Sequence, residues 1–299
     1  MTRPLKLMAV AGFLALAIAL TAIAGGGGAY HTGHAGPSAD ASRNLADLWA
    51  IPPVEVSALL IAALLYAFAV RRVGGVPPGR QAYFYSGIVL ILAAICSPLG
   101  GVAQQGLLTA HMLQHTLIGA VAPLLLLLGM PRAFATAVLP VRWQVRLQWL
   151  QHPARAFGLW TATTIVWLLP PVHHAVLEYQ PLWILQQVSF LAFGMLLWAP
   201  VVECLPAPRW FSTGLKSAYM AGVWFVGLIT ANIYWFSGTA FYSSHAEAAA
   251  AWGFQPLEDQ ANAGTVMMVV HCLLALGATT YLFFRQAREG ELSQRMIEA

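Results

Sequence analysis

Seven apolar runs of about 20 residues dominate the sequence and restrict its fold. They lie near residues 54–71, 81–99, 105–129, 156–172, 182–203, 217–237 and 263–284. A helix rising 1.5 Å per residue needs about 20 residues to cross roughly 30 Å of hydrocarbon, so each run approaches the length of a membrane span. The sequence therefore predicts an all-α fold: a polytopic membrane helical bundle of about seven transmembrane helices after an N-terminal signal-like segment.

Composition excludes a large soluble domain. The chain is 59% hydrophobic and 9% charged, whereas soluble domains have roughly 25% charged residues. Its basic residues are scattered singly between apolar runs, which argues against a nucleic-acid partner and for contact with the lipid bilayer. Three cysteines without CxxC spacing predict neither a disulfide framework nor a zinc site.

The chain divides into four segments. Residues 1–24 have a basic start, an apolar stretch and small residues before a glycine run, which predicts a cleaved signal peptide; an uncleaved first hydrophobic segment is the alternative. Residues 25–50 are predicted as a periplasmic tail containing histidines, 51–286 as the membrane bundle, and 287–299 as a cytoplasmic tail.

Charge predicts the orientation of the bundle. With Met1 in the cytoplasm, alternate crossings place twelve of the thirteen Lys and Arg residues after the signal inside, and only Arg43 outside. The same topology places eight of the nine histidines in external segments or the outer parts of spans, all except His152. Loop histidines such as His173 and His174 are also compatible with simple solvation.

Two histidines lie inside a span, where polar side chains usually face a partner or a cavity. His111 and His115 are four residues apart and therefore share one helical face, from which two ring nitrogens can converge on one metal ion. Hydrogen bonds between helices are the alternative. In the last span Met267 and His271 have the same spacing, and thioether, thiol and imidazole ligands suit copper(I).

The stretch CSPLGGVAQQGLLTAHMLQHTLIGAVAPLLLLLGMP resembles a known family signature. Ser97-Pro98-Leu99, His111-Met112-Leu113-Gln114-His115 and Leu128-Gly129-Met130-Pro131 match the CtaG-type cytochrome c oxidase assembly factors, as do the later FLAFGMLLWAPV and LEDQANAGTVMM. The resemblance implies a multi-pass protein of the bacterial inner membrane, and cytochrome c oxidase subunits and periplasmic copper chaperones as partners. Trp183, Gln186 and Gln187 stand where many members have histidine, which departs from that pattern.

Together these features predict a non-enzymatic assembly factor that delivers or inserts copper at the periplasmic face. The predicted metal ligands are His111, His115, His271, Met267, His173 and His174, and Asp259 with Gln260 would orient an imidazole. A haem-binding membrane oxidoreductase with His111, His115 or His271 as axial ligands is one alternative. A copper transporter is another, although the inner halves of the spans are almost wholly apolar.

Overall fold

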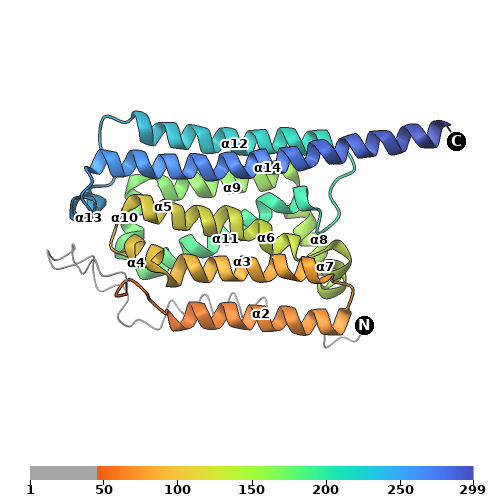
Figure 1. Ribbon diagram of the computed structural model, residues 1–299, viewed down its shortest axis with the longest axis horizontal. Coiled ribbons are helices and arrows are strands. Elements are labelled where there is room, and N and C mark those ends of the chain that lie inside the picture. Colours follow the sequence, from red (N-terminus) through yellow and green to blue (C-terminus); the bar gives the residue numbers. More distant parts are fainter. Residues whose placement is uncertain (1–45, 299) are drawn as a thin grey trace.

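The computed structural model describes residues 46–298, which form helices and turns without a strand (Figure 1). The predicted all-α fold is confirmed. The predicted signal segment and the tail histidines His31 and His34 lie outside the described residues.

Six helices in this part of the chain are long and apolar enough to cross a membrane, so the protein is a multi-pass membrane protein. They are α2 (Pro53–Val73), α3 (Pro78–Cys96), the continuous α5, η2 and α6 (Leu108–Thr116, Leu117–Val121 and Ala122–Leu128), α11 (Gln180–Val202), α12 (Thr213–Phe236) and α14 (Pro256–Glu298).

The remaining apolar run, residues 156–172, forms a shorter helix than predicted. Helix α9 (Pro153–Leu168) has 16 residues, about 24 Å at 1.5 Å per residue. It stops because Pro170 favours an extended conformation in the preceding residue, Leu169, and Pro170 then begins α10 (Pro170–Glu178). At the other extreme, α14 continues to Glu298, so the predicted tail extends the last helix instead of leaving it.

Short helices cover the two ends of the bundle. Helices α4 (Pro98–Gln104), α10 and α13 (Ala246–Ala251) lie at one end, which we call the histidine end, together with the turn η3 (Ser243–His245). Helices α7 (Arg132–Val138) and α8 (Val141–Leu150) lie at the other, the arginine end, where α14 projects past the bundle (Figure 1). Proline in the first turn begins many of these helices, because its fixed φ suits that turn and its missing N–H has no partner there.

A wide helical turn interrupts the third span. Pro123 has no N–H to bond the preceding turn, and residues Leu117–Val121 form a π-helix just before it. The indole of Trp198 in α11 donates to the carbonyl of Ala120 at 2.8 Å. Gly194 brings α11 so close that a Cβ there would lie 2.0 Å from the Gly119 oxygen. Close packing at small residues therefore joins these two spans.

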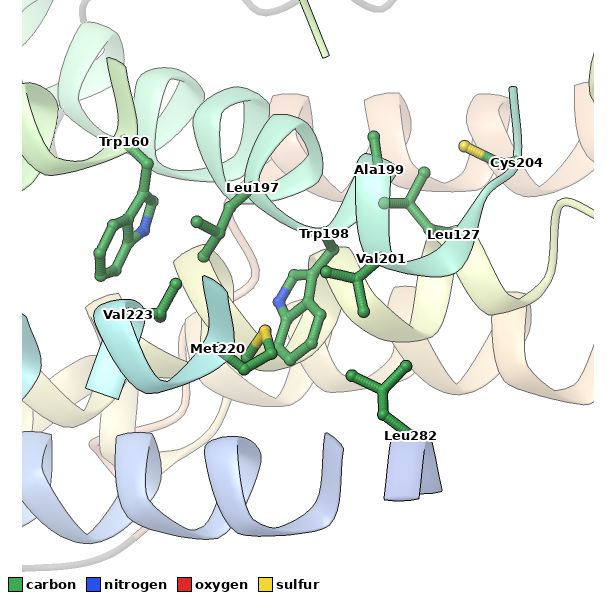
Figure 2. Packing of buried hydrophobic residues seen from close by; sticks show 10 residues of the cluster. All are labelled: Leu127, Trp160, Leu197, Trp198, Ala199, Val201, Cys204, Met220, Val223 and Leu282. Atoms are coloured by element: carbon green, nitrogen blue, oxygen red, sulfur yellow. The ribbon is translucent and has the colours of Figure 1, made fainter. Parts of the chain in front are cut away.

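Large side chains fill the space between α6, α9, α11, α12 and α14. Figure 2 shows this core, in which Trp198 and Met220 lie between α11 and α12 and Leu282 reaches in from α14. Trp198 is 2% exposed and Met220 and Leu282 are fully buried. In a separate cluster, Tyr66 of α2 stacks on Phe84 of α3, which attaches the first helix to the bundle.

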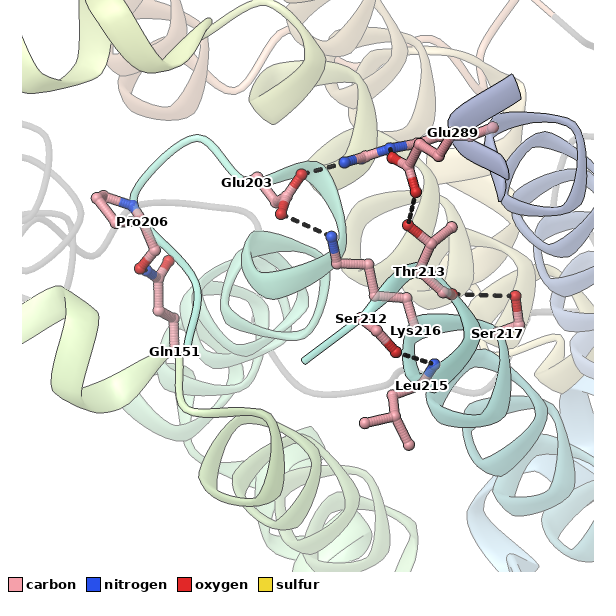
Figure 3. Close-up of polar contacts among 10 residues, drawn as sticks. Gln151, Glu203, Pro206, Ser212, Thr213, Leu215, Lys216, Ser217 and Glu289 are labelled. Atoms are coloured by element: carbon pink, nitrogen blue, oxygen red, sulfur yellow. Dashed lines mark hydrogen bonds and ion pairs between the residues drawn. The ribbon is translucent and has the colours of Figure 1, made fainter. Parts of the chain in front are cut away.

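Charged side chains link three helices at the arginine end (Figure 3). The ammonium of Lys216 in α12 lies 2.6 Å from Glu203, just after α11, and Arg285 of α14 lies 2.9 Å from the same carboxylate. Arg285 also contacts Glu289, which accepts a hydrogen bond from Thr213. Burial opposes ionisation of Glu203, but hydrogen bonds from Lys216 and Arg285 outweigh it and lower the pKa of this carboxyl.

The loop between α12 and α14 contains a short helix. Helix α13 follows His245, and Gly253 takes a positive φ of 83° just after it, as a helix-ending glycine should. The pattern Ser244-x-x-Glu247 resembles a capping box, but that cap does not form, because His245 occupies the N-cap position and makes no side-chain cap bond. The 3₁₀ turn η3 shifts the helix start by one residue.

Candidate functional site: a cluster of four buried histidines

His111 and His115 face each other on α5, near the histidine end. Their Nε2 atoms lie 2.7 Å apart and their ring centroids 4.2 Å apart. Both side chains are buried, at 3% and 5% exposed. One ring must donate its N–H to the lone pair of the other, because two protonated or two bare nitrogens would repel at this distance.

Two further histidines complete the group from distant parts of the sequence. His173 of α10 and His245 of η3 are 72 residues apart, yet their Nε2 atoms lie 2.8 Å from each other. The ring of His111 lies 5.2 Å from that of His173 and 5.8 Å from that of His245, between centroids. We call His111, His115, His173 and His245 the four-histidine cluster.

Backbone and carboxylate contacts position the cluster. Gly106 has a φ of +94°, and its carbonyl accepts a hydrogen bond from Nδ1 of His245; a residue with a side chain would be strained there. Asp259 of α14 is 1% exposed. Its carboxylate accepts hydrogen bonds from the first backbone amides of α5, those of Leu108 at 2.8 Å and Thr109 at 3.0 Å. It therefore caps the helix that carries two of the four rings. The predicted role of Asp259 and Gln260 in orienting an imidazole stays a prediction beside this cap.

Tyr242 forms one wall of the cluster. Its ring lies 4.4 Å from that of His173 between centroids, its hydroxyl donates to the carbonyl of Leu168 at 2.7 Å, and it lies 2.6 Å from the Tyr234 hydroxyl. Burial raises the pKa of Tyr242 to about 12. A neutral phenol therefore connects α9, α12 and η3 beside the imidazoles.

The hydrogen bonds fix the proton positions of one pair. Because the carbonyl of Gly106 can only accept, Nδ1 of His245 carries a proton, and in a neutral ring its Nε2 accepts from Nε2 of His173. Burial, and then the neighbouring His245 and His115, lower the pKa of His173 well below its ordinary value of 6.5. Burial therefore favours the neutral form of His173, whose Nδ1 is buried close to the backbone of Trp167.

Imidazole nitrogens suit copper and zinc, so the donor set fits such a metal. The spacing needs adjustment, since two nitrogens bound tetrahedrally at about 2.0–2.1 Å stand roughly 3.3 Å apart, and these pairs are closer. Among residues 46–298, no three His, Cys, Asp or Glu side chains are arranged to hold a metal ion as they stand. The two ring pairs would have to open by about half an ångström to bind one.

The structure places the other predicted ligands elsewhere. His174 is the exposed neighbour of buried His173, with a side chain 61% exposed that lies 3.2 Å from Glu178. His271 packs against Gly227 of α12, and its Nδ1 bonds the carbonyl of Met267 at 2.7 Å. The side chain of Met267 lies in an apolar cluster with Met112. Ligand roles for His174, His271 and Met267 stay predictions that no contact with the cluster supports.

Helix α11 faces the cluster through the segment that contains Gln187. Phe190 packs on His115 with ring centroids 4.8 Å apart, and Gln187 lies beside the same imidazole. Both polar atoms of the Gln187 side chain are buried without a hydrogen bond within the described part of the chain. Gln187 and Phe190 therefore belong to the wall of the site.

Sequence reasoning missed His245 as a member of the site. It correctly grouped His245 with the other histidines in one part of the topology, but no local spacing connects it to α5. The signal that could have found it is the place of His245 just before the alanine-rich stretch that forms α13.

Two curated proteins are similar in sequence to this chain. A protein of Mycobacterium bovis and one of Mycobacterium tuberculosis, both described as uncharacterized, are each 27% identical to this chain over 223 residues, 66% of the chain. The aligned region is 33% of each relative, so the chain spans about a third of the length of the curated relatives it matches. No solved structure matches the chain.

A family comparison covers most of the bundle. The family described as cytochrome c oxidase caa3 assembly factor matches residues 64–289, which include all four histidines of the cluster and the helices that carry them. The chain therefore belongs to the cytochrome c oxidase caa3 assembly factor family (Caa3_CtaG).

Proposed function

We propose that this protein serves the assembly of cytochrome c oxidase by holding copper at the four-histidine cluster and passing it to an oxidase subunit. The observation that carries the proposal is the convergence of four buried imidazoles from α5, α10 and η3. Copper is the cargo in this scheme, and no bond-making chemistry is required. The client subunit and a periplasmic copper chaperone are the proposed partners.

Charge at the histidine end favours the approach of a cation. No Lys or Arg occurs between Lys216 and Arg285, whereas Glu247 and Glu258 lie in that interval and are exposed. A small pocket beside His245 is lined by Ala246 and Asp259, the sequence neighbours of these acids. Attraction of opposite charges raises the local concentration of a cationic cargo at such a pocket.

The orientation of the bundle supports a periplasmic location for the cluster. Arg71 and Arg72 form the last turn of α2 at the arginine end, and the positive-inside rule assigns that end to the cytoplasm. We therefore propose that the protein lies in the inner membrane, with the histidine end in the periplasm and the C-terminus in the cytoplasm.

The geometry gives no comparable support to the alternatives. Imidazole nitrogens 2.7 and 2.8 Å apart leave no space for a porphyrin between them, as a haem with two axial histidines would need. A transporter would need polar groups through the depth of the membrane, but the middle of the bundle is filled by apolar residues such as Trp198, Met220 and Leu282.

The test compares two adjacent histidines. His173 is fully buried in the cluster and His174 is exposed. The variants His173→Gln and His174→Gln change the composition identically, so they differ only in the location of the lost imidazole. Copper(I) affinity of the purified protein is measured by competition with a coloured chelator. We expect His173→Gln to lose at least about tenfold, since even residues that only support a ligand are worth roughly 10- to 100-fold. His174→Gln should bind as the wild type does.

Wild-type affinity in His173→Gln, or equal loss in both variants, would overturn the copper site. A cellular experiment then separates copper handling from scaffolding. A double variant, His111→Gln with His115→Gln, keeps hydrogen-bonding side chains on α5 but loses the imidazoles. We expect immature oxidase despite normal levels of the variant protein, and normal oxidase activity would contradict the proposal.

A further inference from the structure

Helix α8, at the arginine end, presents an apolar stripe away from the protein. Val141, Val145 and Trp149 recur every four residues and therefore share one face of the helix, and they are 64%, 59% and 59% exposed. Arg142 and Arg146 form an adjacent, exposed stripe with the same spacing. No residue of α8 is buried, so packing against the bundle does not explain its pattern.

The surroundings of α8 are strongly basic. Residues 56–177 contain no Asp or Glu, but they contain seven arginines. These are Arg71, Arg72, Arg80, Arg132, Arg142, Arg146 and Arg155. None of them forms an ion pair with a carboxylate in the described part of the chain. Their charge is therefore available to an external anionic partner.

The fold brings these arginines to one end of the bundle. The guanidinium of Arg80, at the start of α3, donates to the carbonyl of Leu128 at the end of α6, at 3.0 Å. Helices α7 and α8 follow directly after α6, and Figure 1 shows them at the end of the bundle where α2 finishes with Arg71 and Arg72. The basic residues thus lie at the same end of the bundle as the short amphipathic helix.

We propose that α8 lies in the plane of the membrane interface and binds anionic phospholipid headgroups. In this arrangement the stripe of Val141, Val145 and Trp149 enters the boundary between headgroups and acyl chains, as apolar faces of interfacial helices do. Arg142 and Arg146 contact the phosphates, which a guanidinium can bind with two parallel hydrogen bonds. An anionic lipid surface complements the unpaired positive charge around the helix.

Aromatic contacts hold the basic side chains near this surface. The guanidinium of Arg146 lies 5.4 Å from the ring centroid of Trp143, and that of Arg155 lies 4.2 Å from that of Trp149. Arg155 also donates to the carbonyl of Trp149 at 2.7 Å. Such contacts restrict the side chains, and tryptophan itself favours the membrane interface.

Native mass spectrometry of the detergent-purified full chain tests the proposal. The protein is titrated with phosphatidylglycerol or phosphatidylcholine, and bound lipids are counted. Each basic residue near an anionic surface is worth roughly fivefold in affinity, so Arg142→Gln with Arg146→Gln should lower phosphatidylglycerol affinity about thirtyfold. Affinity for phosphatidylcholine should change little.

A second double variant provides a control of equal charge. Arg288→Gln with Arg295→Gln removes two exposed charges from the projecting part of α14, and we expect it to bind lipid as the wild type does. Arg142→Lys with Arg146→Lys keeps the charge and should retain most of the preference for phosphatidylglycerol over phosphatidylcholine. An excess of inorganic phosphate should not displace the lipid, because a free ion does not engage the apolar stripe.

Three results would overturn the proposal. The wild type could show no preference for phosphatidylglycerol, or both double Gln variants could lose it equally, which would make the effect one of net charge. The Arg142→Gln and Arg146→Gln variant could also retain full preference while an acidic segment of a partner protein protects α8 from hydrogen exchange. That outcome would assign the surface to a protein.

Discussion

Removing Glu203 should destabilise the protein far more than removing its partner Lys216. The Lys216 side chain is 2% exposed and its ammonium lies 2.6 Å from the Glu203 carboxylate. Glu203→Ala leaves this charge buried without a counter-ion, whereas Lys216→Met leaves Glu203 paired with Arg285 at 2.9 Å. The two halves of one ion pair are therefore energetically unequal.

The magnitudes follow from burial. Breaking a fully buried pair by removing one partner costs about 3–5 kcal/mol, and because Glu203 is 32% exposed we expect about 2–3 kcal/mol for Glu203→Ala. Replacing buried Lys216 by an apolar side chain of similar volume should cost about 1 kcal/mol or less. At about 2 °C per kcal/mol for a chain of this size, the unfolding temperature should fall by about 5 °C in Glu203→Ala. In Lys216→Met it should fall by at most about 2 °C.

Tryptophan fluorescence of the protein in nanodiscs, followed during heating, measures both shifts. The pH dependence provides an independent check. Because the pKa of Glu203 is lowered in the folded protein, its contribution is complete above the ordinary value of 4.5 and is lost as the pH falls through the lowered value. The gap between wild type and Glu203→Ala should therefore close in acid. Equal destabilisation by Lys216→Met, or a gap that persists in acid, would refute the reasoning.

Other variants test the packing and the topology. Asp259→Asn weakens the charged cap of α5 and should cost about 1–2 kcal/mol, seen as faster amide exchange in the first turn of α5. Gly194→Ala forces a Cβ to 2.0 Å from a carbonyl oxygen of η2 and should cost about 3 kcal/mol or more, while Gly158→Ala, whose Cβ would meet no atom within 4 Å, should unfold at the wild-type temperature. Met112→Leu conserves volume and should cost less than about 1.5 kcal/mol without changing copper affinity. A phosphatase fused after Ala299 should be inactive, and activity there would place the C-terminus outside the cytoplasm.

The sequence by itself determined the architecture. Runs of about 20 apolar residues leave no stable alternative to helices in a membrane, because every backbone N–H and C=O must be paired within its own segment. The i, i+4 spacing of His111 and His115 likewise determined that they share a face of α5, since that relation depends only on helical geometry. The count of apolar residues in the run 156–172 did not reveal that Pro170 ends its helix at Leu168.

Tertiary structure decided the membership of the site. His173 and His174 are equivalent in sequence, and only the packing of α10 turns the first into the bundle and the second to the surface. His245 joins from a loop because the carbonyl of Gly106 orients its ring, and His271, on a span like His111, contacts α12 instead. Sequence patterns report relations within one helix, whereas the four-histidine cluster depends on the rotation of several helices about their own axes, which is set by side chains packing across the bundle.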